Sequence, residues 1–168
     1  MLSLTPMQKA IALDARDRRI LEILQADAMT PLAEIAERVG LSTTPCWRRI
    51  QRLEKDGVIV GRVALLDPAR LNVGVSVFVS VRTNQHNAAW LQRFRKALDA
   101  IPEIVEAYRM SGDVDYLLRV VVPDIAGYDA VYKRLIETVE LADVSSGFSM
   151  EVLKQTTALP LAHAPLRR

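Results

Sequence analysis

Basic side chains are concentrated between residues 42 and 55, where four Arg and Lys residues stand against one acidic residue, Glu54. The excess is local, because residues 14–62 contain nine Lys and Arg against eight Asp and Glu. Guanidinium groups gathered on one helix face can contact the phosphates of DNA and can pair with base edges. An ordinary solvated helix face has the same composition, so the charges alone leave both interpretations open.

The pattern around these charges predicts a helix-turn-helix at residues 31–56. Apolar side chains recur at helical spacing in both halves, with Gly40 at the turn between them. In the second half this spacing places Cys46, Ile50 and Leu53 on the inward face and Thr44, Arg48, Gln51, Arg52 and Lys55 on the opposite face. Ser42 is a suitable N-cap for the second helix. Pro45 falls in its first turn, where the missing N–H would have no helical partner. The second helix should therefore start near Thr43.

We expect this second helix to read the major groove of DNA. Its N-terminus would lie against phosphate, and Thr44 and Arg48 would reach base edges. Arg49 and Arg52 would hold the sugar-phosphate backbone. The predicted DNA-contacting residues are Ser42, Thr43, Thr44, Pro45, Trp47, Arg48, Arg49 and Arg52.

An upstream amphipathic helix, with Asp14 as its expected N-cap, completes a three-helix DNA-binding domain over residues 13–57. The β-branched run at residues 58–66 predicts a strand, and residues 58–72 form the expected connecting strand and hinge. Residues 1–12 are an N-terminal extension.

The second half alternates strand and helix patterns in the order βαββαβ, which predicts a ferredoxin-like domain over residues 73–157. Valine occupies every odd position from 73 to 81, as expected for a strand with one apolar face. Further strands are expected at residues 104–110, 114–122 and 144–156, with helices at residues 88–100 and after Asp124. The fold class is therefore α+β, a winged helix-turn-helix followed by a ferredoxin-like βαββαβ domain.

Both helices of such a domain lie on one face of the sheet, which leaves the other face bare. Exposed Val, Leu and Tyr side chains there would form a larger apolar patch than soluble monomers usually carry. We therefore expect sheet-to-sheet homodimers, which would also present two reading helices to a two-fold operator.

A glycine-led turn at Gly112-Asp113-Val114-Asp115-Tyr116 is a candidate binding loop. Its backbone N–H groups could take a carboxylate, and Asp113 or Asp115 could meet an ammonium group, so that both ends of a free amino acid would have partners. Ordinary turn chemistry explains the same residues equally well.

Composition excludes several classes of function. The 168 residues carry a net charge of +2, which argues against a non-specific nucleic-acid coat protein. One cysteine and two histidines give no credible metal site. The sequence has no apolar run of membrane-spanning length and no leader pattern, so we expect a cytoplasmic protein.

The order of these elements resembles the feast/famine (Lrp/AsnC) family of bacterial and archaeal transcriptional regulators. The matching residues are Leu13-Asp14, Asp17 and Ile20-Leu21; Leu41-Ser42, Thr44-Pro45-Cys46 and Arg48-Arg49; Arg52-Leu53-Glu54 and Gly57-Val58-Ile59; and Ala64-Leu65-Leu66-Asp67-Pro68. The resemblance implies double-stranded operator DNA and an amino-acid effector as partners, and dimers that assemble into octamers.

The resemblance also implies an effector site that a neighbouring subunit closes. The expected residues are Gly112, Asp113, Asp115, Tyr116, Ile125, Ile136, Ser146, Gly147, Phe148 and Ser149. Matches such as Tyr108-Arg109-Met110-Ser111-Gly112 look closest to the branch that activates cysteine-detoxification genes, which implies cysteine as the effector.

Two further expectations concern alternatives and the chain end. A small amino-acid-binding protein or enzyme, with N-terminal helices used only for oligomerisation, is the competing hypothesis; it lacks a visible catalytic constellation, so we expect no enzyme. The chain from residue 158 to 168 has no periodicity and is predicted to be a flexible tail, in which Arg167-Arg168 would add little to DNA contact.

Overall fold

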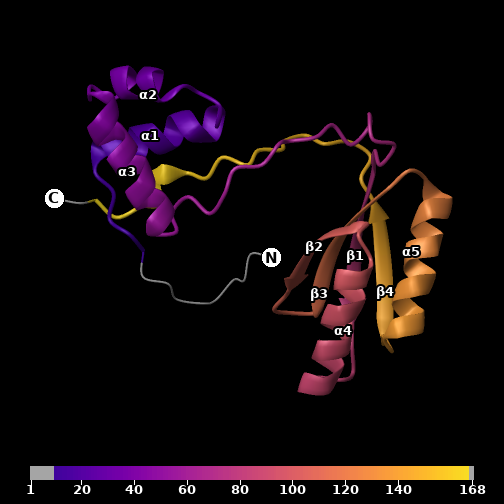
Figure 1. Cartoon of the computed structure of the whole chain (residues 1–168). Helices are drawn as coiled ribbons and strands as arrows, with labels where there is room; N and C mark the ends of the chain where they lie inside the picture. The colour runs from indigo at the N-terminus through magenta and orange to yellow at the C-terminus, as the bar shows by residue number, and fades with distance from the viewer. Residues whose placement is uncertain (1–9, 167–168) are drawn as a thin grey trace. The chain divides into compact units, whose positions relative to one another are not determined.

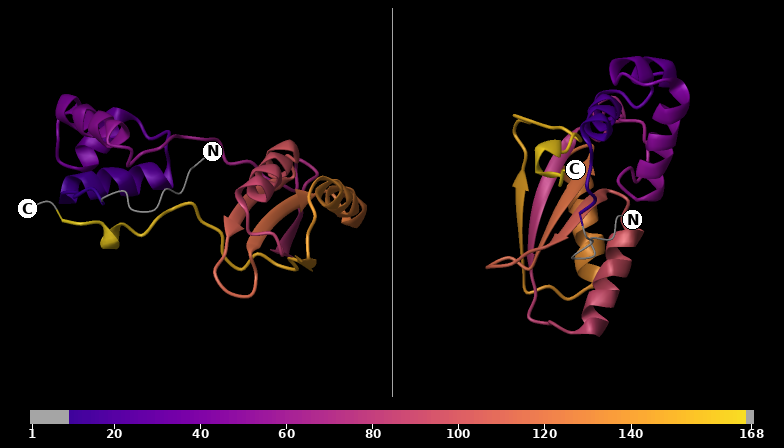
Figure 2. Two further views of the ribbon diagram at one scale, coloured as in Figure 1. Left: turned by 90° about the horizontal axis from the view of Figure 1, so that it is seen from below. Right: turned by 90° about the vertical axis from the view of Figure 1, so that its left-hand side faces the viewer.

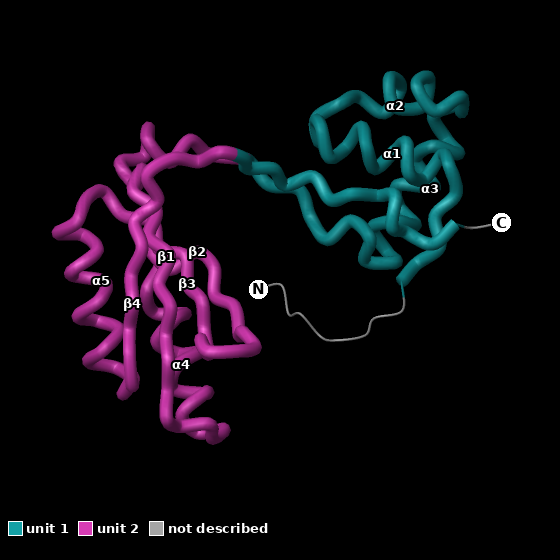
Figure 3. The backbone as a smooth tube through the Cα atoms, turned by 180° about the vertical axis from the view of Figure 1, so that it is seen from behind, with its two compact units in different colours: residues 1–64, 154–168 teal, residues 65–153 magenta. Residues whose placement is uncertain are grey.

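The computed structural model describes residues 10–166. It contains two compact units, one made of Met1–Ala64 with Lys154–Arg168 and the other of Leu65–Leu153 (Figure 3). Most of the expected N-terminal extension, and Arg167-Arg168, lie outside the described residues. The helices of residues 10–166 include none with the length and hydropathy of a membrane span.

The first unit is built on three helices, α1 (Ala15–Ala26), α2 (Leu32–Arg38) and α3 (Thr43–Lys55), as predicted (Figure 1). Asp14 caps α1, and Gly40 adopts a φ of 65° in the turn before α3. Such a positive φ favours glycine because it has no Cβ. One buried cluster joins the three helices, with Ile20, Ile35 and Leu53 among its members.

The strand predicted at residues 58–66 is wrong for this structure, which has no strand between α3 and residue 75. The backbone N–H groups of Val58 and Ile59 instead donate to Leu53 O, at 2.9 and 3.1 Å. Val60 and Val63 are 72% and 81% exposed. A strand needs a hydrogen-bonded neighbour, and the described residues offer none here. Residues 58–66 therefore form no strand within the single described chain.

The second unit confirms the βαββαβ order. Its elements are β1 (Val75–Arg82), α4 (Ala88–Ala100), β2 (Ile104–Arg109), β3 (Tyr116–Val122), α5 (Ile125–Thr138) and β4 (Asp143–Phe148). The sheet order is β2-β3-β1-β4, and every pair is antiparallel. Figure 2 shows both helices on one side of the sheet.

The alternating valines of β1 determine how the second unit is packed. Val77, Val79 and Val81 are buried beneath the helices, together with Trp90 and Phe94 of α4. Those two rings stack at a centroid distance of 4.9 Å, and the indole N–H of Trp90 donates to Glu140 O at 2.9 Å.

The fourth strand ends earlier than the prediction of residue 156. Its last partner pair in the register joins Phe148 to Val77, two residues after β1 begins. Beyond it β1 offers little backbone for pairing, so the chain continues without strand structure. Met150 and Leu153 are accordingly 95% and 87% exposed.

The expectation of a flexible tail from residue 158 is also corrected. A 3-10 helix at Leu161–His163 and a backbone hydrogen bond from Leu13 N–H to Pro165 O, at 2.9 Å, attach this segment to the first unit. This docking could not be predicted from the sequence, because a short segment that packs through Leu161 and Ala164 alone has no periodicity.

Candidate DNA-binding and effector sites

The α3 helix has one buried and one exposed face. Cys46, Ile50 and Leu53 are buried in the three-helix core, as predicted. Thr44 and Arg48 are exposed on the other side, and Trp47 is 51% exposed. Thr43 and Pro45, in the first turn, are exposed as well.

Ser42 occupies the N-cap position of α3, as predicted. Its side chain makes no capping hydrogen bond, so it supplies no acceptor to the first-turn N–H groups of α3. Such groups bind anions readily at a helix N-terminus.

A buried carboxylate forms ion pairs with two of the three arginines on α3. Asp17 of α1 is fully buried. Its Oδ1 accepts from Arg49 Nη1 at 2.8 Å, and its Oδ2 accepts from Arg52 Nη2 at 2.5 Å. Arg49 Nη1 also donates to Asp14 Oδ2 at 2.5 Å. The structure therefore assigns to Arg49 and Arg52 a partner that helical spacing alone did not predict, and the outward position expected for Arg52 is corrected.

The two aspartates also form a reciprocal cap at the start of α1. The Asp17 N–H donates to Asp14 Oδ1 at 2.8 Å, and the Asp14 N–H donates to Asp17 Oδ2 at 3.2 Å. Burial acts to raise the pKa of Asp14, but the Asp17 N–H and the Arg49 guanidinium outweigh it and hold that pKa below its ordinary value. The hydrogen bond to Asp14 correspondingly raises the pKa of Arg49.

Because Arg49 and Arg52 are paired, two cationic side chains of α3 are left without an ion pair in the described part of the chain. Arg48 and Lys55 are exposed and have no ion pair within residues 10–166. Glu54 pairs with Arg62 at 2.8 Å instead. Arg48 is thus the unpaired cation nearest Thr44 and Trp47 among the described residues, and Lys55 lies two turns further along the same face.

The predicted effector loop is tied to the end of β1. Gly112 has a φ of 111°, which glycine tolerates at a tight turn. Asp115 Oδ2 accepts from the Thr83 N–H at 2.9 Å, and the Asp115 N–H donates to Val81 O at 3.1 Å. The second oxygen, Oδ1, lies 3.9 Å from His86 Nδ1. Asp115 is therefore both a structural acceptor and a half-exposed anion.

The remaining predicted effector residues lie elsewhere in the unit. Ser146 hydrogen-bonds the Tyr128 hydroxyl, and the Phe148 ring contacts that of Tyr128 edge-on, with centroids 5.4 Å apart. In the register, Tyr116 pairs with Val81 at one end of β1, whereas Gly147, Phe148 and Ser149 lie towards the other end. A single chain thus does not gather the predicted effector residues into one pocket.

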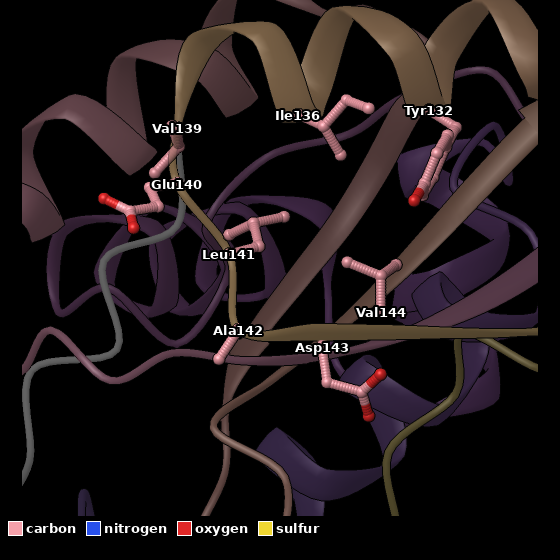
Figure 4. Close-up of a pocket in the computed structure, with 8 residues that line it drawn as sticks. All are labelled: Tyr132, Ile136, Val139, Glu140, Leu141, Ala142, Asp143 and Val144. Carbon is pink, nitrogen blue, oxygen red and sulfur yellow. The ribbon is translucent and has the colours of Figure 1, made fainter.

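Two surface pockets lie near separate members of the predicted set. One of about 400 Å³ lies between α5 and β4 and includes Ile136 (Figure 4); its lining residues are Tyr132, Ile136, Val139, Glu140, Leu141, Ala142, Asp143 and Val144. A smaller one of about 120 Å³ includes Tyr116, His86 and Arg109. Ile125 lines neither pocket and is 72% exposed. Sequence reasoning missed His86, whose Nδ1 lies 3.9 Å from Asp115 Oδ1, and Arg109, which lines the same pocket as His86.

A helix-turn-helix unit followed by an antiparallel βαββαβ unit defines a DNA-binding protein with a separate sensor domain. Residues 13–60 match the model of the winged helix-turn-helix DNA-binding domain, and residues 76–159 match that of the Lrp/AsnC ligand binding domain. The chain belongs to the Lrp/AsnC family of transcriptional regulators. It is a DNA-binding regulator with an amino-acid ligand-binding domain, as the sequence predicted.

Individual relatives agree with this assignment. The chain is 50% identical over 149 residues to the glutamate uptake regulatory protein of Zymomonas mobilis, which covers 89% of this chain and 91% of the relative. An AsnC family regulator from Agrobacterium tumefaciens has a TM-score of 0.87 and 62% identity, covering 90% and 99% of the two chains. A Neisseria meningitidis regulator solved as an L-Met complex has a TM-score of 0.86 and 32% identity, with the same coverage.

Substitution of the unpaired Arg48 and of the paired Arg49 should have different effects, the first on operator binding and the second on stability. Arg48→Ala should abolish selective operator binding and leave the melting temperature nearly unchanged, because this side chain is exposed and unpaired within the described residues. Arg49→Ala should lower the free energy of unfolding by about 2–3 kcal/mol, the size of a lost hydrogen bond to a charged group, since Asp17 would keep its pairing with Arg52. Fluorescence anisotropy with an operator selected from random duplexes, alongside calorimetry, separates the two effects. Unchanged selectivity of the Arg48 variant would contradict its assignment.

Proposed function

We propose that the protein reads its operator through the exposed face of α3, with Thr44 and Arg48 at base edges and Trp47 beside them. The observation that supports this most is the division of the arginines. Asp17 holds Arg49 and Arg52, and Arg48 projects from the same helix without an ion pair among the described residues. Ser42, Thr43 and the exposed first turn would contact phosphate. Arg49 and Arg52 would act mainly by orienting the helix, a change from their expected role.

We further propose that the second unit works as a homodimer through the open face of its sheet. Val77, Val79 and Val81 of β1 are buried, so the even residues of the strand lie on the uncovered side, where Phe78 is 44% exposed. Tyr108, also 44% exposed, hydrogen-bonds Glu106, which in turn pairs with Arg119 at 2.8 Å. A second copy of the chain would cover the apolar side chains of this surface, whose charged groups already pair with one another. We further propose that the dimers associate into octamers, as the family resemblance implies.

The dimer is tested at the centre of this face. Phe78→Glu should convert the dimer into monomers, because a carboxylate would be desolvated in the interface without a partner. Light scattering coupled to size-exclusion chromatography measures the mass directly. Met29→Glu, at an 85% exposed turn position of the first unit, is the control and should leave the mass unchanged. A Phe78→Glu variant with the mass of the unchanged protein would rule out this face.

The effector is proposed to be a small amino acid bound next to the 112–116 loop. Asp115 Oδ1 offers a carboxylate to an ammonium group, and His86, which lies 3.9 Å from that oxygen, also lines the 120 Å³ pocket together with Trp90 and Tyr116. In the assembled protein, residues 146–149 of a neighbouring subunit would close the site. Cysteine is the first candidate, but relatives named for glutamate uptake or solved with L-Met show that sequence similarity alone does not select the ligand.

A thermal-shift screen against the twenty amino acids tests the sensor and names its ligand. An amino acid at 100 times its Kd should stabilise the protein by about 2.7 kcal/mol, a clear rise in melting temperature. Asp115→Asn keeps an acceptor for the Thr83 N–H but loses the charge, so it should abolish the shift while basal operator affinity is retained. Asp99→Asn, on the exposed side of α4, is the matched control. A full shift with the Asp115 variant would contradict the proposed ammonium contact.

A further inference from the structure

We propose that the C-terminal segment, residues 159–166, is an integral part of the DNA-binding domain and positions its reading helix. The chain leaves the first unit after residue 64, forms the second unit, and returns to the first from Lys154 onward (Figure 3). The two matched domain models cover residues 13–60 and 76–159. The docking of residues 160–166 therefore belongs to neither matched domain.

One end of the segment is fixed to the last turn of α1 by the side-chain amide of Gln25. Its Oε1 accepts from the Leu159 N–H at 2.6 Å, and its Nε2 donates to Leu159 O at 3.3 Å. This reciprocal pair satisfies both backbone groups of one residue, as a neighbouring strand would do. Leu161 and Ala164 then pack against the three-helix core.

The other end is fixed around the start of α1. The Leu13 N–H donates to Pro165 O at 2.9 Å, and Leu13 forms a parallel bridge with Leu166. The Arg18 guanidinium donates to Ala164 O. These contacts lie immediately before and after the reciprocal cap of Asp14 and Asp17.

The position of these contacts links the segment to DNA reading. Asp14 and Asp17 are the carboxylates that hold Arg49 and Arg52 of α3. Bracing the first turn of α1 therefore fixes the two anions that orient α3, and with it the direction in which Arg48 projects. Gln25, Leu161 and Arg18 are thus positioning residues. They affect DNA binding by holding α1 in place, and we propose no contact between them and the DNA.

The proposal is tested in the full chain with the double variant Gln25→Ala and Leu161→Ala. Operator affinity is measured by anisotropy well below the melting temperature, and amide hydrogen exchange is followed over residues 14–20. We expect about tenfold weaker operator binding, the size that one or two lost net hydrogen bonds would produce, and faster exchange at the start of α1. Circular dichroism should remain that of the unchanged protein. His163→Ala, at an exposed position of the same 3-10 turn, should change neither quantity.

Deletion of residues 158–168 should cause the same loss of affinity and additionally lower the melting temperature. The double variant retains the whole chain, so the conclusion does not depend on how well the shortened protein folds. A double variant that melts earlier but keeps both its operator affinity and its α1 exchange rates would show that the segment only adds stability. That result would overturn the proposed positioning role.

Discussion

The pairing of buried Asp17 with two arginines is the interaction on which the DNA-binding domain depends. An ionised carboxylate without exposure to water is costly unless it is paired and hydrogen-bonded. Here Arg49, Arg52 and the Asp14 N–H supply its partners. These contacts cross from α1 to α3, so they set the rotation of α3 as well as compensating the charge. The exposed face that results carries Thr44, Trp47 and Arg48.

A simpler constraint shapes the second unit. Alternation along β1 buries Val77, Val79 and Val81 under two helices, and the same alternation turns Phe78 to the uncovered side of the sheet. Because both helices pack on one face of the sheet, the other face stays uncovered. This uncovered face is the surface through which we propose that the protein dimerises. The hairpin bearing Asp115 is hydrogen-bonded to the end of the same strand. Dimer surface and proposed effector loop thus share β1 as their support.

Much of this architecture was predictable from the sequence, because its signals are local and periodic. The helices α1 to α5, the caps at Asp14 and Asp124, the turn at Gly40 and the βαββαβ order along the chain all follow from spacing and turn chemistry. The failures share a physical cause. Residues 58–66 have strand composition but no backbone partner, and the C-terminal segment docks through contacts that have no period.

The candidate sites divide in the same way. Helical spacing correctly separated the buried Cys46 from the exposed Thr44 and Arg48. It misplaced Arg52, because a pattern within one helix does not reveal a buried carboxylate on another, 35 residues away in sequence. The proposed effector residues lie towards both ends of β1 in one chain, as expected if a neighbouring subunit completes the site that we propose.

A structure of the protein bound to its operator tests the central claim most directly, through the side-chain partners of the three α3 arginines. We predict Arg48 at base edges in the major groove, with Arg49 and Arg52 still paired to Asp17. Arg49 and Arg52 released from Asp17 and bound to phosphate, with Arg48 away from the DNA, would contradict this assignment of roles.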